Sequence, residues 1–184
     1  MYGRTRRQIL HRPRARAGGG LPLVTMLLVG ALILVYGYRH WTAEPLAPLT
    51  GRARIADGDS IEIAGNRIRL EGIDAPELHQ TCSDPAGQPW PCGRTAADEL
   101  RRYIAGRELT CLPSGRDRYR RLLAVCSLAD GSDVNAWLVR QGWAVSYSFA
   151  GSYSSEQNEA KAARRGIWAG TFVTPSEWRR QHMD

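Results

Sequence analysis

Two neighbouring segments in which apolar and polar residues alternate predict a β-hairpin in the middle of the chain. The segments are residues 53–65, ARIADGDSIEIAG, and residues 66–73, NRIRLEGI. Ile61 and Ile63 share one face of the first arm, because successive side chains of a strand point to opposite faces. The Gly65-Asn66 pair between the arms is typical of a tight turn. Arg69 is expected to project from the face opposite to its apolar neighbours.

In the rest of the domain, segments whose apolar residues recur with a helical period alternate with segments that have the period of a strand. Residues 94–106, RTAADELRRYIAG, place Ala97, Leu100 and Ile104 on one helical face. Strands are predicted at 108–112 and 121–128, and helices at 133–143 and 154–166. A last helix opens with a capping box formed by Thr174 and Glu177. Strands, a helix, more strands and then helices predict an α+β domain whose sheet can close as a small barrel.

The N-terminal part is apolar over residues 21–38, LPLVTMLLVGALILVYGY, and carries arginines on both sides. Eighteen helical residues reach about 27 Å, enough for a hydrocarbon core. We therefore predict a basic cytoplasmic tail over 1–20, then a transmembrane helix or signal anchor, and a Pro-rich tether over 42–50. A cleaved signal peptide is the alternative. A domain over 51–170 and a C-terminal helix over 171–184 complete the predicted organisation.

Four cysteines follow the apolar segment, at positions 82, 92, 111 and 126. None of them forms a CxxC pair, which disfavours a zinc site. Two disulfides formed in an oxidising compartment fit better, although four cysteines allow three connectivities. We favour Cys82–Cys92, which would close a Pro- and Gly-containing loop, and Cys111–Cys126, which would join two strands across a turn.

The net charge of +7 does not indicate a basic DNA-binding surface. Seven arginines and no acidic residue lie in residues 1–39, so the other 145 residues hold 25 − 7 = 18 basic and 18 acidic side chains. The folded part is formally neutral, which argues against binding through a basic patch.

The hairpin region carries an unusual set of charges, in the motifs DGD at 57–59 and DAPE at 74–77. Alone, the first motif is typical of a turn and the second of a helix start. Together with Arg69 they fall within twenty-one residues, and the two arms can bring them to one place. Hard cations such as Ca²⁺ prefer several carboxylate and carbonyl oxygens at short range, so this region is a candidate metal site.

These motifs resemble those of the staphylococcal nuclease (thermonuclease) family. The similarity covers IADGDSIEI and RIRLEGIDAPE, then GRDRYRRLLAVC, then NAWLVRQGWA, in the family's order from about Arg52 to Trp168. The resemblance implies an OB-fold, a five-stranded β-barrel with helices packed around it, which agrees with the predicted order of elements.

The resemblance also implies roles for individual residues. Asp59 and Asp74 correspond to carboxylate ligands of a catalytic Ca²⁺, Ala75 to a ligand through its backbone carbonyl, and Asp57 to an outer carboxylate. Glu77 corresponds to the residue that orients or deprotonates the attacking water. Arg69 and Arg121 correspond to two arginines that bind the scissile phosphate, and Tyr119 and Tyr147 to substrate contacts.

The segment DRYRR departs from the usual DRYGR, because Arg120 stands in place of a turn glycine. Either Arg120 or Arg121 can then be the second arginine, and the spacing from Asp117 favours Arg121. Guanidinium groups suit this task because they bind phosphate as a two-pronged donor.

The sequence therefore predicts a monomeric, Ca²⁺-dependent nuclease that hydrolyses phosphodiester bonds in DNA, with RNA as a further candidate substrate. It is expected at a bacterial inner membrane, inserted in the bilayer through residues 21–38, with its N-terminus cytoplasmic and its catalytic domain periplasmic or extracellular. A non-catalytic nucleic-acid- or protein-binding module on the same barrel is the alternative, because a fold does not imply activity. An envelope structural protein would explain neither DGD nor DAPE.

Overall fold

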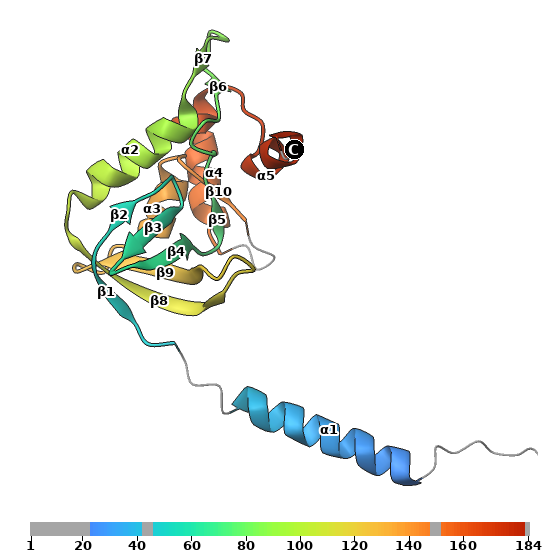
Figure 1. Ribbon diagram of the computed structural model, residues 1–184. Coiled ribbons are helices and arrows are strands. Elements are labelled where there is room, and N and C mark those ends of the chain that lie inside the picture. The colour runs from blue at the N-terminus through green and yellow to red at the C-terminus, as the bar shows by residue number, and fades with distance from the viewer. Residues whose placement is uncertain (1–22, 42–45, 148–151, 183–184) are drawn as a thin grey trace, which may run out of the picture. The chain divides into compact units, whose positions relative to one another are not determined.

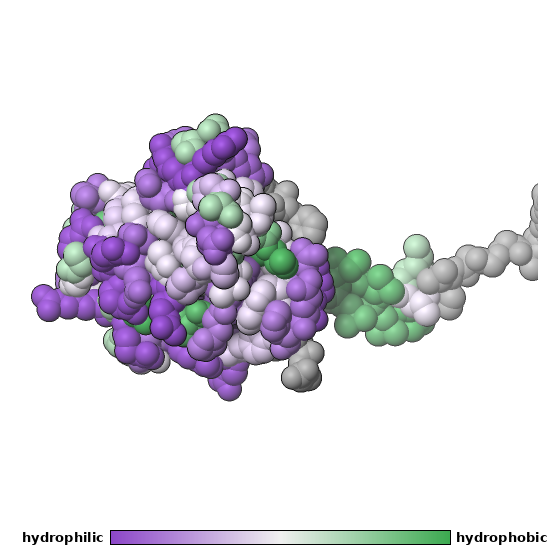
Figure 2. Space-filling view, turned by 90° about the horizontal axis from the view of Figure 1, so that it is seen from above, coloured by the Kyte–Doolittle hydropathy of each residue, from purple (hydrophilic) through white to green (hydrophobic). Residues whose placement is uncertain are grey.

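The structure, a computed structural model, describes residues 23–41, 46–147 and 152–182. The chain divides into two compact units, Met1–Glu44 and Pro45–Asp184. The described part of the first unit is helix α1 (Leu23–Trp41), whose exposed side chains are largely apolar (Figure 2). Among the described residues, no helix has both the length and the apolar character needed to cross a membrane. Residues 21–22 of the predicted span and 42–45 of the predicted tether lie outside the described residues.

The second unit is an α+β domain built around one main sheet (Figure 1). Its strands are β1 (Leu49–Arg52), β2 (Arg54–Ile55), β3 (Ser60–Ile63), β4 (Asn66–Leu70), β8 (Glu108–Arg116) and β9 (Leu122–Leu128). Two small sheets pair β5 (Ile73–Asp74) with β10 (Val145–Ser146), and β6 (Cys82–Ser83) with β7 (Pro89–Trp90). The helices are α2 (Cys92–Ile104), α3 (Val134–Arg140), α4 (Ser154–Ala162), a 3₁₀ helix η1 (Gly166–Ala169) and α5 (Pro175–His182).

The main sheet is nearly closed into a barrel, as the sequence predicts. Its strand order is β1-β8-β9-β4-β3-β2, so β1 and β2 lie at opposite edges although only Ala53 separates them in the chain. The chain therefore bends at Ala53 and links the two edges. A Cβ on Gly51 of β1 would lie only 2.9 Å from a side-chain carbon of Ile63. When β1 and β2 are counted as one bent strand, the barrel has the five strands of the prediction.

The predicted hairpin is formed by β3 and β4, but its turn lies one residue earlier than predicted. The register pairs Ile63 with Asn66, which leaves Ala64 and Gly65 as the two turn residues. Both have positive φ, 48° and 77°, as a two-residue turn of type I′ requires. Asn66 is already part of the strand, and its side-chain amide donates to the Ile63 carbonyl at 3.4 Å.

The barrel is filled by the apolar faces that the alternating pattern predicts. Ile61, Ile68 and Leu70 are at most 2% exposed. Helix α2 lies against β2, and α3 packs against β9 and α4. The buried Asn135 joins α3 to the sheet, because its amide nitrogen donates to the Glu71 and Ala124 carbonyls at 3.0 and 3.2 Å.

Two disulfides have the connectivity that the sequence favours, Cys82–Cys92 and Cys111–Cys126. The first joins β6 to the start of α2. The second joins directly paired residues of β8 and β9, and both of its cysteines are fully buried.

Replacing both Cys111 and Cys126 by alanine is expected to lower the free energy of unfolding by about 3 kcal/mol. The bond closes a loop with a sequence separation of 15, and a loop of that length restricts the unfolded chain by about this amount. Denaturant unfolding of the oxidised protein and of the variant measures the difference. An unchanged midpoint and slope would contradict this expectation.

Candidate active site

A groove on the domain brings the predicted site residues together. Its volume is about 1420 Å³. It is lined by residues from the hairpin, from the segment that follows it, from the β8–β9 loop and from α5; among them are Asp57, Asp59, Arg69, Ala75, Glu77, Tyr119, Arg121, Tyr147 and Arg179.

Two buried carboxylates and one arginine meet at this groove, which Asp59 and Arg69 line. Asp59 and Asp74 are 4% and 2% exposed. Arg69 binds both of them, with Nη1 at 2.5 Å from Asp59 Oδ1 and Nη2 at 2.6 Å from Asp74 Oδ1. Burial raises the pKa of Asp59 to about 7, although the charge of Arg69 opposes the rise. The charge of Arg69 thus does not offset the effect of burial on Asp59.

The sequence around Asp59 explains why these groups meet. A Cβ on Gly58 would lie 2.7 Å from the Ala75 Cβ, so the glycine allows the DGD loop to lie directly on DAPE. The Ala75 backbone N–H donates to Asp59 Oδ2 at 2.9 Å. Asp57 Oδ1 accepts from the Asp59 backbone N–H at 3.0 Å, and its charge contributes to the raised pKa of Asp59.

Glu77 lies next to this pair and is held through its backbone. Its N–H donates to the side chain of the fully buried Gln80 at 3.1 Å, and the Gln80 amide nitrogen donates to the Val173 carbonyl at 2.7 Å. Helix α2 starts against the same segment, because a Cβ on Gly93 would meet the Glu77 carbonyl oxygen at 1.7 Å. The Glu77 backbone is therefore fixed, and the residue lines the groove.

The β8–β9 loop presents Arg121 to the groove. Asp117 closes the loop, since its Oδ1 accepts from the backbone N–H groups of Tyr119 and Arg121, both at 2.9 Å. Asp117 Oδ2 binds Arg121 Nε at 2.7 Å. Arg121 Nη1 then donates to Ser60 Oγ at 3.2 Å, and Ser60 Oγ donates to Asp59 Oδ1 at 3.1 Å. Arg121 is thus joined to the buried carboxylates through one hydroxyl.

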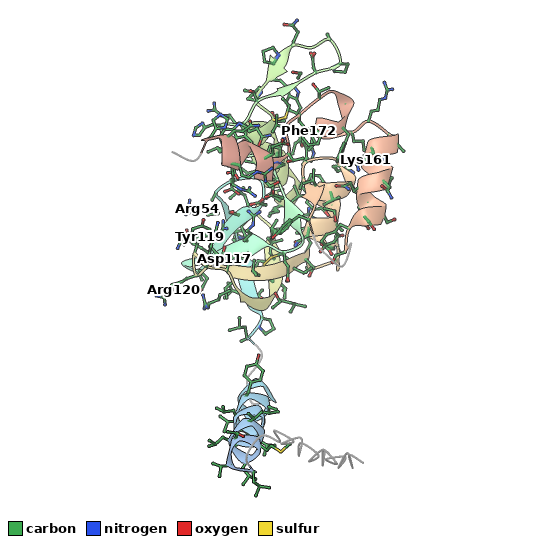
Figure 3. All side chains as sticks on the ribbon, turned by 90° about the vertical axis from the view of Figure 1, so that its right-hand side faces the viewer. Arg54, Asp117, Tyr119, Arg120, Lys161 and Phe172 are labelled. Atoms are coloured by element: carbon green, nitrogen blue, oxygen red, sulfur yellow. A yellow bond between two sulfur atoms is a disulfide. The ribbon has the colours of Figure 1, made fainter. Side chains whose placement is uncertain are left out.

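Arg120 is exposed and points outward from the same loop (Figure 3). Its φ is 63°, in the left-handed region that favours glycine. The structure therefore places Arg121 in the groove, as the spacing from Asp117 favours, and not Arg120.

Replacing Arg120 by glycine is expected to raise the free energy of unfolding by about 1 kcal/mol and to leave the nuclease activity that the sequence predicts unchanged. A left-handed conformation costs a non-glycine residue about 1–2 kcal/mol, and the greater freedom of unfolded glycine offsets part of this. Thermal unfolding and DNA cleavage by the two proteins measure both quantities. A large loss of turnover would show that Arg120 itself contacts the substrate.

Tyr119 and Tyr147 lie at the rim of the groove and are 55% and 65% exposed. The Tyr119 ring lies under the guanidinium groups of Arg118 and Arg121, at 4.9 and 5.6 Å from its centroid. The Tyr147 backbone N–H donates to the Gly72 carbonyl at 2.8 Å. Both rings are available to a ligand in the groove.

Within the described part of the chain, no group of three or more His, Cys, Asp or Glu side chains is arranged to hold a metal ion. The oxygens of Asp59 and Asp74 are instead bound by guanidinium groups. The donor chemistry nevertheless fits a hard divalent cation, because the buried Asp59 and Asp74 lie within reach of one guanidinium and offer the carboxylate oxygens that such cations prefer. A bound cation would use Asp59, Asp74 and the Ala75 carbonyl in place of these arginine contacts.

Arg179 of α5 is a member of the site that the sequence analysis missed. Its guanidinium binds Asp74 and Glu77, which precede it by 105 and 102 residues. The sequence offered only a weak signal for this contact. The residues three and four positions before Arg179 are Ser176 and Pro175, so no acidic partner precedes it at helical spacing.

Comparison with known proteins identifies the class to which this fold and site belong. A sequence profile described as "Staphylococcal nuclease homologue" matches residues 67–170, more than half of the chain. The chain belongs to the staphylococcal nuclease family. This confirms the enzyme class that the sequence predicts, an endonuclease that hydrolyses phosphodiester bonds.

Three relatives show how far the similarity extends. "Succinoglycan biosynthesis protein ExoI" of Rhizobium meliloti (strain 1021) is 41% identical over 143 residues, which cover 76% of this chain and 74% of that protein. An "Uncharacterized endonuclease" of Escherichia coli O157:H7 is 36% identical over 145 residues, covering 72% and 86%. A protein of the same name from Haemophilus influenzae is 33% identical over 137 residues, covering 70% and 71%.

Proposed function

We propose that this protein is a calcium-dependent nuclease that cleaves DNA, and RNA as a second substrate, in the groove formed by the hairpin, the β8–β9 loop and α5. The observation that carries the proposal is the meeting of two buried carboxylates, Asp59 and Asp74, with Arg69 beside Glu77. Phosphodiester hydrolysis needs an activated water and positive charge around the phosphate. This arrangement supplies groups for both.

The proposed mechanism assigns each group a separate task. Glu77 takes a proton from a water molecule, and the water oxygen forms a bond to phosphorus. The bond to the leaving oxygen breaks with its electron pair on that oxygen, which takes a proton from solvent. Arg69 and Arg121 donate to the non-bridging oxygens, where negative charge develops. Ca²⁺, when bound, supplies Lewis-acid polarisation of the phosphate.

The two arginines differ in how they are held. Arg69 extends from the centre of the sheet, where β4 is paired with both β3 and β9. Arg121 is positioned by Asp117 and by Ser60. Two guanidinium groups fixed from different elements can bind a phosphate from two sides, which a single flexible lysine cannot do. Tyr119 and Tyr147 at the rim are suited to stack on bases or to donate to neighbouring phosphates.

We propose further that the enzyme acts outside the cytoplasm and is attached to the bacterial inner membrane by its N-terminal segment. The two disulfides support an oxidising compartment. The arginine-rich start and the apolar run over 21–38 support attachment with the N-terminus inside. Protease treatment of intact spheroplasts should degrade the domain, and carbonate washing should leave the chain with the membranes. Protection from protease would contradict the location outside the cytoplasm. Release by carbonate would contradict the attachment to the membrane.

Cleavage of defined substrates tests the activity itself. The full chain, oxidised and purified, should nick plasmid DNA and cleave single-stranded DNA and RNA when Ca²⁺ is present. Excess chelator should abolish each reaction. A folded protein that binds these nucleic acids without cleaving them would contradict the proposal and favour a non-catalytic binding module.

A further inference from the structure

The mechanism above gives no role to Arg179, although this side chain makes close contacts with two site carboxylates. Its Nη1 and Nη2 lie 3.0 Å from Asp74 Oδ1 and Oδ2, and Nη1 lies 2.6 Å from Glu77 Oε1. One guanidinium therefore engages both oxygens of Asp74 and one oxygen of Glu77. A divalent cation and the attacking water would need these same atoms.

We propose that Arg179 is a built-in counter-cation that competes with the divalent metal ion for Asp74, so that metal binding releases helix α5 from the site. This inference rests on the proposed function, because it concerns the same carboxylates. It assigns α5 a regulatory role, in which the metal-free enzyme closes its own groove.

The group that competes with the metal ion is Arg179 and not Arg69, because the two arginines belong to elements that differ in how firmly they are held. Arg69 belongs to β4, a strand paired on both sides, and its side chain is 16% exposed. Arg179 belongs to an eight-residue helix near the end of the chain, and its side chain is 36% exposed. Displacing Arg179 disturbs no sheet and exposes a guanidinium that already lies partly in solvent.

Arg179 supplies the polar contacts that hold α5 on the domain, and the helix start is also packed through the buried Pro175. Among the described residues, the hydrogen bonds and ion pairs between positions 175–182 and the rest of the domain before Thr174 all come from this arginine. The preceding anchor is separate: the Val173 carbonyl accepts from Gln80 at 2.7 Å. The helix can therefore leave the groove while Val173 stays in place.

The charges favour exchange of Arg179 for the metal ion over simultaneous binding of both to Asp74. A cation held by Asp59 and Asp74 would face the Arg179 guanidinium at close range across a largely buried site. Like charges at such a distance repel, and more strongly than in water because solvent is partly excluded. Asp74 has two oxygens, and Arg179 engages both, so a metal ion that binds Asp74 has to share an oxygen with this guanidinium or displace it.

Calcium binding by the full-length oxidised chain, measured by titration calorimetry without nucleic acid, tests the inference. Arg179→Ala should bind Ca²⁺ about tenfold more tightly than the wild type, because two competing charged hydrogen bonds are removed. Arg179→Lys keeps the charge without the two-pronged geometry and should fall between them. Arg180→Ala is the matched control, since Arg180 is an exposed neighbour on the same helix without an ion pair among the described residues; it should bind as the wild type does.

Hydrogen exchange supplies a second measurement that needs no variant. In the wild type, Ca²⁺ should increase amide exchange over residues 175–182 and slow it around Asp59 and Asp74. In Arg179→Ala, the helix should exchange rapidly with or without Ca²⁺. If helix exchange in the wild type is unchanged or slowed by bound Ca²⁺, the inference is wrong.

The outcomes separate this inference from the proposed function. Calcium binding by the wild type with equal or weaker binding by Arg179→Ala and Arg179→Lys would overturn the inference alone. An absence of calcium binding in every folded variant would overturn both the inference and the calcium dependence of the nuclease. Tighter binding in the two Arg179 variants, with normal Arg180→Ala, supports both.

Discussion

Glu77→Gln should lower kcat for DNA cleavage by about 10²- to 10⁴-fold while leaving KM within a few-fold of the wild type. The amide is nearly isosteric with the carboxylate but cannot accept a proton from water, and a positioned general base contributes a factor of this size. The Glu77 backbone is fixed by Gln80 and by the start of α2, so the substitution should not move the groove. Steady-state kinetics at saturating Ca²⁺ measure both constants.

Glu99→Gln is a suitable control for this variant. Glu99 lies on α2 and pairs with Arg102 on the surface, so removing its charge should change neither constant. A Glu77→Gln enzyme that retains more than one tenth of the wild-type kcat would exclude Glu77 as the base. A raised KM with unchanged kcat would instead assign it to substrate binding.

Arg69→Ala should reduce both turnover and stability, because the side chain has two tasks. Removing one donor from a developing negative charge costs about 10²- to 10³-fold in kcat. The same change leaves Asp59 and Asp74 buried without Arg69, which binds both of them. Breaking a buried ion pair from one side typically costs about 3–5 kcal/mol in the free energy of unfolding. Cleavage kinetics and denaturant unfolding measure the two losses.

Arg69→Lys separates the two tasks. It keeps a positive charge for the carboxylates, so most of the stability should return, but an ammonium group cannot replace the two-pronged donor. Turnover should therefore remain at least tenfold below the wild type. Arg102→Ala, a surface arginine on α2, is the control and should behave as the wild type. If Arg69→Lys restored full turnover, the specific role of the guanidinium would be refuted.

The elements with a strong local pattern could be predicted from the sequence. Alternation of apolar residues located β3 and β4, and the apolar face of α2 placed Leu100 and Ile104 in the core. The hairpin turn was misplaced by one residue because Gly65 followed by Asn66 favours a turn at these two positions. In the structure, strand pairing continues to Asn66 and places Ala64 in the left-handed region instead.

Features that depend on distant parts of the chain could not be predicted from periodicity. Closure of the barrel follows from the bend at Ala53, where β1 leaves one edge and β2 joins the other. The contact of Arg179 with Asp74 joins residues 105 positions apart, and no local pattern encodes it. The motifs DGD and DAPE could be assigned to one site because the hairpin between them is short, so a local element brings them together.

The rate of DNA cleavage as a function of free Ca²⁺ tests the central claim most directly. A single-stranded oligonucleotide with a fluorophore and a quencher would be used with the full-length wild type and with Asp74→Asn, a change at a predicted metal ligand. We predict saturable, Ca²⁺-dependent cleavage by the wild type that chelator abolishes, and a much lower rate at every Ca²⁺ concentration for Asp74→Asn. Equal rates for the two proteins, or cleavage that persists in excess chelator, would contradict the assignment of this groove as a calcium-dependent nuclease site.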